Sequence, residues 1–144
     1  MANIVLIHGA YQGGWIWQSV AKILRSKGHT VLAPTLAGCA ERSRQIRPGI
    51  TTETHGDEIA NLLFYEDIKD AVLVGTSSGG MVMAKAAELA RHRIKRLVFA
   101  DALALMDGER IGDFVNRETA INTYLSSGPP RHDVVNRLFR DLEE

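Results

Sequence analysis

The chain has 144 residues, 45% hydrophobic and 24% charged, which is ordinary for one globular domain with a sizeable core. Its 17 Lys and Arg residues balance 17 Asp and Glu residues, so the charge gives no reason to expect nucleic acid or an anionic membrane as a partner. No apolar run is long enough to cross a bilayer, no signal peptide is visible, and Cys39 is the single cysteine. These features predict a cytoplasmic location, because one cysteine forms no internal disulfide.

The first third of the chain alternates between strand and helix patterns. Residues 3–7 are uniformly apolar and predict a buried strand. The segment 15–26 predicts a helix that stops at Gly28, and residues 30–33 predict a short second strand. Residues 35–51 are rich in glycine, proline and arginine, which indicates a long surface loop.

The same alternation continues toward the C-terminus. A helix is predicted over residues 53–65, although Gly56 weakens its first turn. A third strand at 71–74, a third helix at 78–91 and a fourth strand at 94–100 follow. Strands and helices at this spacing predict an α/β fold with a parallel sheet of about four strands, flanking helices and right-handed crossovers.

One serine lies in a glycine-rich turn between a predicted strand and a predicted helix. Residues 75–80 read Gly-Thr-Ser-Ser-Gly-Gly, so Ser77 has a glycine two residues away on each side. Such glycines permit a sharp turn and a close helix–strand approach, and the turn then projects the serine hydroxyl into solvent. The following helix aims its free N–H groups and the positive end of its dipole at the reacting atom. Ser77 is therefore the candidate nucleophile.

A second glycine-rich loop follows the first strand, in the sequence His8-Gly9-Ala10-Tyr11-Gln12-Gly13-Gly14. The two loops together resemble the α/β-hydrolase fold: His-Gly-Ala is similar to its oxyanion loop, and Gly-Thr-Ser-Ser-Gly is similar to its nucleophile elbow. The opening HGAxxGGWxW resembles the plant methylesterase/hydroxynitrile lyase group and its bacterial esterase relatives. The resemblance covers residues 1–105, and the last two strands of the family's sheet are missing here. It implies the strand order 30–33, 3–7, 71–74, 94–100.

The resemblance implies a serine carboxylesterase-type hydrolase that acts on a small-molecule ester through an acyl-enzyme. The backbone N–H groups of Ala10 and Ser78 are the candidate oxyanion hole, and Gly9, Tyr11 and Asp101 are candidate pocket residues. Gly9 favours ester hydrolysis, because hydroxynitrile lyases of the group tend to carry threonine at this position. No cofactor is implied, and no cluster of residues has the spacing of metal ligands.

The catalytic base and acid are not evident. Family members place the acid after the seventh strand and the histidine after the eighth, and neither strand is visible, so the chain is expected to be inactive alone. His92 lies roughly 20 Å along the helix from Ser77 at ~1.5 Å per residue, and His132 is a weak candidate for the base. Asp101 follows the fourth strand and is interpreted as a pocket-wall or turn residue, and His8 as a structural histidine.

The remaining interpretations concern packing and organisation. Trp15 and Trp17 are expected in the core, and the arginines of the 41–47 loop in solvent. Residues 1–103 are predicted to form the hydrolase core and residues 104–144 the start of a helical lid, with a helix over 131–142.

The fourth strand leaves an apolar edge at 94–100, which predicts self-association or pairing with a completing chain. Three rival functions remain open. One is a hydroxynitrile lyase-like activity that uses the same serine as a base. The second is a binding protein without turnover, and the third is an interaction fragment that uses the bare edge.

Overall fold

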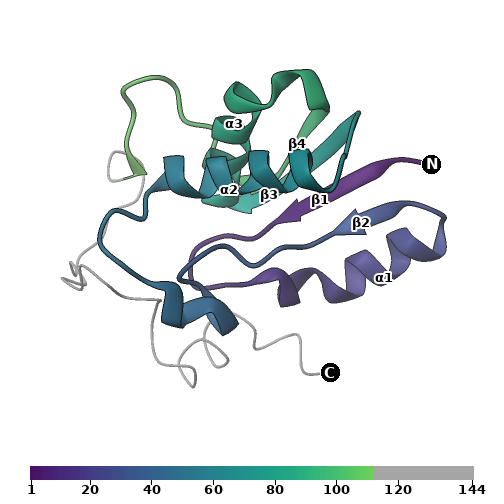
Figure 1. The fold of residues 1–144 in the computed structure, drawn as a ribbon, viewed down its shortest axis with the longest axis horizontal. Helices are drawn as coiled ribbons and strands as arrows, with labels where there is room; N and C mark the ends of the chain where they lie inside the picture. The colour runs from purple at the N-terminus through teal and green to yellow at the C-terminus, as the bar shows by residue number, and fades with distance from the viewer. Residues whose placement is uncertain (112–144) are drawn as a thin grey trace.

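The computed structural model describes residues 1–111. A parallel sheet of four strands runs through it in the order β2-β1-β3-β4 (Figure 1). The strands are Asn3–Ile7 (β1), Thr30–Leu32 (β2), Ala71–Ser77 (β3) and Ile94–Ala102 (β4). The predicted fold class and strand order are confirmed. The predictions on residues 112–144, including His132 and the helix at 131–142, lie outside the described residues.

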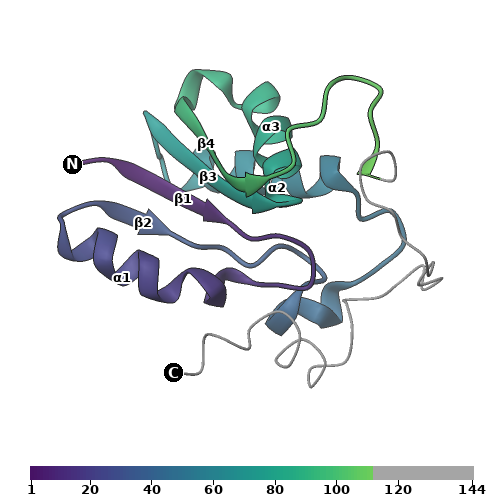
Figure 2. The same ribbon diagram turned by 180° about the vertical axis from the view of Figure 1, so that it is seen from behind.

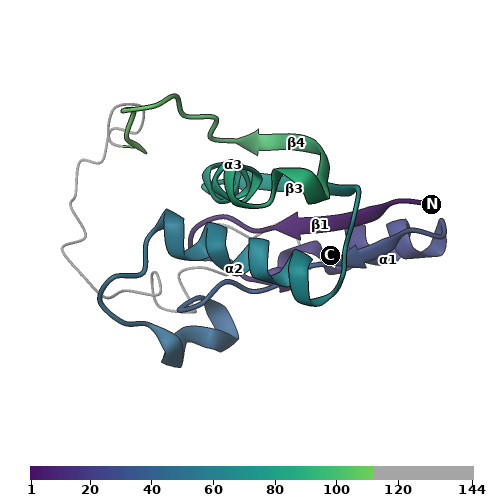
Figure 3. The ribbon, with the colours of Figure 1, turned by 45° about the horizontal axis from the view of Figure 1, so that its top comes forward.

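Helices cover both faces of the sheet. α2 (Thr52–Tyr65) and α3 (Gly79–Leu89) lie side by side on one face, and α1 (Gln18–Ser26) covers β1 and β2 on the other (Figure 3). Alternate residues of each strand point to opposite faces, so the sheet separates two cores. Val5 and Ile7 pack with α2 and α3, whereas Ile4 and Leu6 pack with α1.

Two element boundaries differ by three residues from the sequence prediction, and the other boundaries differ by less. Residues Gly14–Trp17 form a 3-10 turn, so the α-helix predicted from residue 15 begins at Gln18. The third strand continues past residue 74 to Ser77, through residues without a strongly apolar pattern. The pairing of Ile7 with Gly75 and of Ser77 with Ala102 extends this strand. Backbone pairing with two neighbours therefore decides where β3 ends.

The predicted surface loop at 35–51 is partly buried, which corrects that prediction. Residues 35–38 are buried, and a 3-10 turn, Ala40–Gln45, follows them. The side chains of His8, which follows β1, and of α2 hydrogen-bond the backbone of this segment, and such partners allow a loop to enter the interior.

Gly56 has a packing role where the sequence indicated only a weak first turn. A Cβ atom at this position would lie 2.5 Å from Cγ of Lys85 and 2.7 Å from its Cβ. α2 and α3 therefore approach each other closely at this glycine. Within residues 1–111, no helix has the length and apolar character needed to span a membrane.

Candidate active site

Ser77 lies at a sharp turn between β3 and α3. β3 ends at Ser77, and Ser78 is the N-cap residue of α3, which begins at Gly79. Ser77 is exposed and has a φ of 50°, in the left-handed region that residues other than glycine rarely adopt. Such a conformation costs on the order of 1–3 kcal/mol and persists only where the surrounding structure holds it.

The glycines around Ser77 allow this turn. A Cβ atom at Gly75 would lie 2.7 Å from the carbonyl oxygen of Gly79, and one at Gly79 would lie 2.7 Å from those of Ile7 and His8. Only glycine fits at such distances. The start of α3 therefore rests directly on the end of β1, at the edge where β1, β3 and β4 all terminate (Figure 2).

The loop after β1 lies against the serine. A Cβ atom at Gly9 would be 2.7 Å from Cβ of Ser77 and 3.2 Å from the carbonyl oxygen of Thr76. The N–H of Gly9 donates to Oε1 of Gln12 at 2.8 Å, and Tyr11 has a φ of 63°. The structure thus brings Gly9 next to Ser77, with Ala10 as the next residue in a loop that Gln12 fastens.

Ser78 stands at the N-terminus of α3. The first N–H groups of a helix lack partners within the helix, and the helix dipole adds a partial positive charge there. The backbone of Ser78 is adjacent to the Ser77 hydroxyl, so developing negative charge next to Ser77 would meet this end of the helix.

His8 is a buried histidine whose two ring nitrogens are both engaged. Only 1% of its surface is exposed. Its Nε2 accepts from the N–H of Leu36 at 3.0 Å, which assigns the ring proton to Nδ1, and Nδ1 donates to the carbonyl oxygen of Gly9 at 2.8 Å. Burial lowers the pKa of His8 and thus favours the neutral ring. These bonds agree with the structural role predicted from the sequence.

A polar network next to the loop after β1 was not predicted. Glu58 of α2 accepts from the N–H of Ala37 at 3.0 Å and forms an ion pair with Arg42, which also donates to the carbonyl oxygen of Thr35. The Thr35 hydroxyl oxygen accepts from the N–H of Gly14 at 2.8 Å. Segment 35–42 is therefore fastened to both α2 and the loop after β1.

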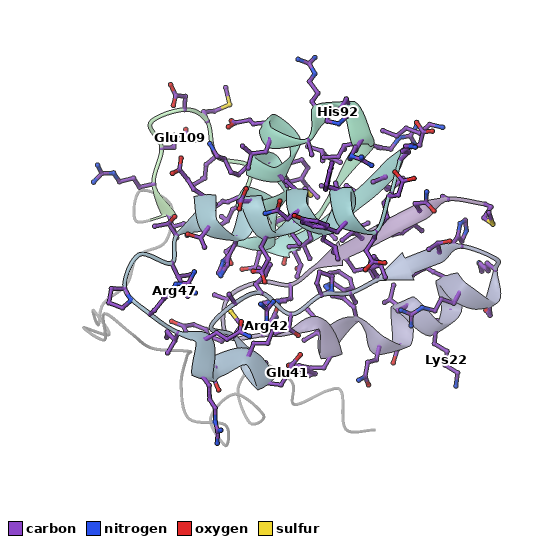
Figure 4. The ribbon with its side chains drawn as sticks, viewed as in Figure 1. Lys22, Glu41, Arg42, Arg47, His92 and Glu109 are labelled. Carbon is purple, nitrogen blue, oxygen red and sulfur yellow. The ribbon has the colours of Figure 1, made fainter. Side chains whose placement is uncertain are left out.

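The expectation that the arginines of the 41–47 loop lie in solvent is wrong for Arg42. Figure 4 shows Arg42 among the loops at this end of the sheet, whereas Lys22 and His92 project from the periphery. Sequence reasoning missed Arg42 and Glu58 because Glu58 lies 16 residues from Arg42 and 21 residues from Ala37, and no local pattern marks such partners.

Asp101 lies in an irregularity of β4 beside Ser77. Gly75 pairs with Phe99 and Ser77 with Ala102, so β4 has one extra residue here, and Asp101 takes a φ of 49°. The N–H of Leu103 donates to the carbonyl oxygen of Ser77 at 2.9 Å. Asp101 is exposed, and its proximity to the elbow is compatible with the predicted pocket-wall or turn role.

The other residues considered in the sequence analysis lie in different parts of the structure. Tyr11 is half-buried in the loop after β1, and Trp17 packs against the core beneath α1. Trp15 is 38% exposed, so its predicted place in the core is wrong. His92 is exposed in the 3-10 turn before β4, at the end of that strand remote from Asp101. Among residues 1–111, no three His, Cys, Asp or Glu side chains gather as metal ligands would.

Comparison with known proteins identifies the family. The sequence pattern of the alpha/beta hydrolase fold matches residues 2–139. The chain belongs to the α/β-hydrolase fold family. This match covers nearly the whole sequence, and it agrees with the parallel sheet and with the two glycine-rich loops.

Several relatives of the chain are named as esterases. A carbendazim hydrolyzing esterase from Nocardioides sp. (strain SG-4G) is 39% identical over 111 residues, covering 77% of this chain and 46% of its own length. An alpha-hydroxynitrile lyase from Arabidopsis thaliana is 37% identical and covers 69% of this chain and 39% of its own. Other relatives from that plant are named methylesterases.

A solved structure supports the same assignment. An extracellular alpha/beta-hydrolase from a Paenibacillus species, whose description states homology to tobacco salicylic acid binding protein 2, superposes with a TM-score of 0.72 and 34% identity. The superposition covers 78% of this chain and 46% of that one. The chain therefore spans about half the length, or less, of these relatives. The family to which it belongs includes esterase-type hydrolases.

Proposed function

We propose that Ser77 is the nucleophile of a serine carboxylesterase-type hydrolase. The observation that carries the proposal is the backbone of Ser77, an exposed serine held at a φ of 50° between a strand and the N-terminus of a helix. A strained turn of this kind presents a hydroxyl at the end of a sheet, where sites of open α/β folds form. The esterase names of the relatives support the same reaction class.

In the proposed reaction, Oγ of Ser77 attacks the ester carbonyl carbon while a base takes its proton. The carbonyl oxygen becomes an oxyanion, which accepts hydrogen bonds from the N–H groups of Ala10 and Ser78. Collapse of this intermediate breaks the bond to the alcohol, which leaves with the proton, and the acyl-enzyme remains. Water then attacks the acyl-enzyme and releases the acid and free Ser77.

The base and the acid of this reaction come from outside residues 1–111. The ring nitrogens of His8 are both engaged with backbone groups, which argues against His8 as the base. Asp101 has no histidine partner among the hydrogen bonds of residues 1–111 and is proposed to line the pocket with Gly9 and Tyr11. We expect the 144-residue chain alone to lack Ser77-dependent turnover.

Gly9 favours an ester over a cyanohydrin as the substrate. The position lies directly over Ser77, since a Cβ atom there would come within 2.7 Å of the serine Cβ. A threonine, as hydroxynitrile lyases of the group tend to have, would place a hydroxyl beside the nucleophile only after the two loops moved apart. The close approach of the two loops at Gly9 therefore supports a small, fairly apolar ester as the proposed substrate.

The first test is hydrolysis of p-nitrophenyl butyrate by the purified chain, with Ser77→Ala as the control. A chimera supplies the missing groups: the matched 111-residue segment of the Nocardioides esterase is exchanged for that of this chain. We expect the folded chimera to hydrolyse the ester and its Ser77→Ala variant to lose at least a thousandfold in kcat, in line with nucleophile removal. A folded chimera whose rate is unchanged by Ser77→Ala would overturn the proposal.

A further inference from the structure

The carbonyl group of Gly9 fixes the direction of the neighbouring Ala10 N–H. Residues 1–111 contain no cis peptide bond, so the C=O of Gly9 and the N–H of Ala10 point in opposite directions from one peptide plane. Nδ1 of His8 donates to that carbonyl oxygen at 2.8 Å, and Oε1 of Gln12 accepts from the N–H of Gly9 at 2.8 Å. The orientation of the Ala10 N–H therefore depends on the position of the His8 ring.

The His8 ring is held in turn by a backbone segment that α2 fastens. The N–H of Leu36 donates to Nε2 of His8 at 3.0 Å. The next residue, Ala37, donates its N–H to Oε2 of Glu58 at 3.0 Å, and its carbonyl oxygen accepts from Nε2 of His55 at 2.9 Å. A first route of hydrogen bonds therefore runs from Glu58 through the His8 ring to the start of the loop after β1.

A second route from Glu58 reaches the other end of that loop. Oε1 of Glu58 forms an ion pair with Arg42, which lies among the loops at this end of the sheet (Figure 4). Arg42 also donates to the carbonyl oxygen of Thr35, whose hydroxyl oxygen accepts from the N–H of Gly14 at 2.8 Å. The two oxygens of one carboxylate thus hold Gly9 and Gly14, the two ends of the loop.

α2 is also in direct contact with the helix that carries the other proposed oxyanion donor. Gly56 of α2 lies against Lys85 of α3, and Ser78 is the N-cap residue of α3. Only 26% of the Glu58 side chain is exposed, and hydrogen bonds to a charged group are shorter and stronger than neutral ones. α2 therefore supports both the loop that bears Ala10 and the helix that follows Ser78.

We propose that Glu58 is a positioning residue of the oxyanion hole: its carboxylate holds both ends of the loop after β1 and so fixes the direction of the Ala10 N–H beside Ser77. This proposal rests on the roles proposed for Ser77 and Ala10. Glu58 acts through the backbone, by keeping the donor where negative charge develops on the substrate. A displacement of about 1 Å at such a site can lower a rate by about a hundredfold.

The ring proton of His8 tests the first route in the 144-residue chain itself. Because the N–H of Leu36 donates to Nε2, the neutral ring carries its proton on Nδ1. We expect ¹⁵N spectra of the parent chain at about pH 8, where the ring is neutral, to show this single tautomer. Glu58→Ala releases the backbone beside Leu36, so its spectra should show both tautomers.

Arg93→Ala is the matched control. Arg93 donates to the carbonyl oxygens of Leu63 and Ile68 at the C-terminal end of α2, and only 13% of its side chain is exposed. Its loss should destabilise the fold without moving His8, so the ring should keep its proton on Nδ1. A folded Glu58→Ala chain whose His8 ring also stays entirely in that tautomer would overturn the proposal.

The kinetics of the chimera with the Nocardioides esterase test the consequence for the reaction. We expect Glu58→Ala to lower kcat for p-nitrophenyl butyrate by about ten- to a hundredfold per folded molecule, with KM changed by less than about threefold. Circular dichroism gives the folded fraction of each variant. Glu58→Gln keeps an oxygen that accepts from the N–H of Ala37, so it should retain more of the kcat than Glu58→Ala.

The two proposals fail in different ways. If kcat per folded molecule is the same in the Glu58→Ala and Arg93→Ala chimeras, Glu58 has no positioning role, and the role of Ser77 is untouched. If Ser77→Ala leaves the rate of the chimera unchanged, the proposed nucleophile is refuted, and the tautomer of His8 in the 144-residue chain still decides whether Glu58 holds the loop.

Discussion

Ser77 is held in a backbone conformation that a Cβ atom disfavours, and this strain should lower the free energy of unfolding by a measurable amount. Only glycine adopts a φ of 50° without strain, whereas alanine keeps the Cβ that opposes it. We predict that Ser77→Gly is more stable than Ser77→Ala by about 1 kcal/mol in urea unfolding. The control is Ser19, exposed in α1, where alanine should instead exceed glycine by about 1 kcal/mol. The same ranking at both positions would contradict the strained turn.

His8 makes stability depend on pH. Its pKa in the folded chain is lowered from the ordinary value of 6.5, chiefly by burial. Below about pH 6.5 the unfolded chain takes up a proton that the folded chain resists, so the free energy of unfolding falls as the pH drops toward the lowered pKa.

Replacement of His8 should therefore flatten the pH profile. We predict that His8→Asn is less stable than the parent at pH 8, because it disturbs the bonds to Gly9 and Leu36. The difference between the two should shrink below pH 6.5, by up to ~1.4 kcal/mol per pH unit. Urea unfolding at a series of pH values measures this. His92→Asn, at an exposed site, is the control, and a constant difference for His8→Asn would exclude the mechanism.

At the scale of elements, the close contact between α2 and α3 should make alanine less favourable than glycine at position 56, which is the reverse of the usual order inside a helix. Alanine in place of glycine inside a helix ordinarily stabilises it by about 1 kcal/mol. At Gly56 the added Cβ would lie 2.5 Å from Cγ and 2.7 Å from Cβ of Lys85, atoms close to the backbone that move little. We predict that Gly56→Ala destabilises the chain by about 1–3 kcal/mol in chemical unfolding.

Lys85→Ala provides the test of that cause. This substitution removes Cγ but keeps Cβ. The decrease in the free energy of unfolding caused by Gly56→Ala should therefore be smaller in the Lys85→Ala background. Lys85 also forms ion pairs with Glu53 and Glu88, and the single Lys85→Ala variant accounts for their loss. A stabilising Gly56→Ala would show that the helices have room to separate.

The elements that sequence patterns predicted are those whose pattern is local. The apolar run at 3–7 and the glycines around Ser77 signal a strand and a sharp turn by themselves, and both lie where predicted. The buried segment at 35–38 carries no local signal, because His8 and Glu58 bury it by binding its backbone. The candidate nucleophile was therefore predictable from residues 75–80, whereas the network that fastens the neighbouring loop was not.

At the scale of the whole molecule, burial is uneven across the sheet. Val5, Leu6 and Ile7 of β1 are at most 1% exposed, because helices cover both faces of that strand. β3 lies next to it, with Leu73 fully buried. Toward β4 the exposure rises to 38% at Val98 and 43% at Phe99. The central strands and the β4 edge should therefore open with different free energies.

Hydrogen exchange of the native chain would reveal this gradient. We predict the slowest amides in β1 and β3, exchanging only with global unfolding, and faster exchange by local opening in the three-residue strand β2. We expect the amides of β4 to exchange faster than those of β1 and β3, because side-chain exposure rises toward this strand. Uniform protection across all four strands would contradict the gradient.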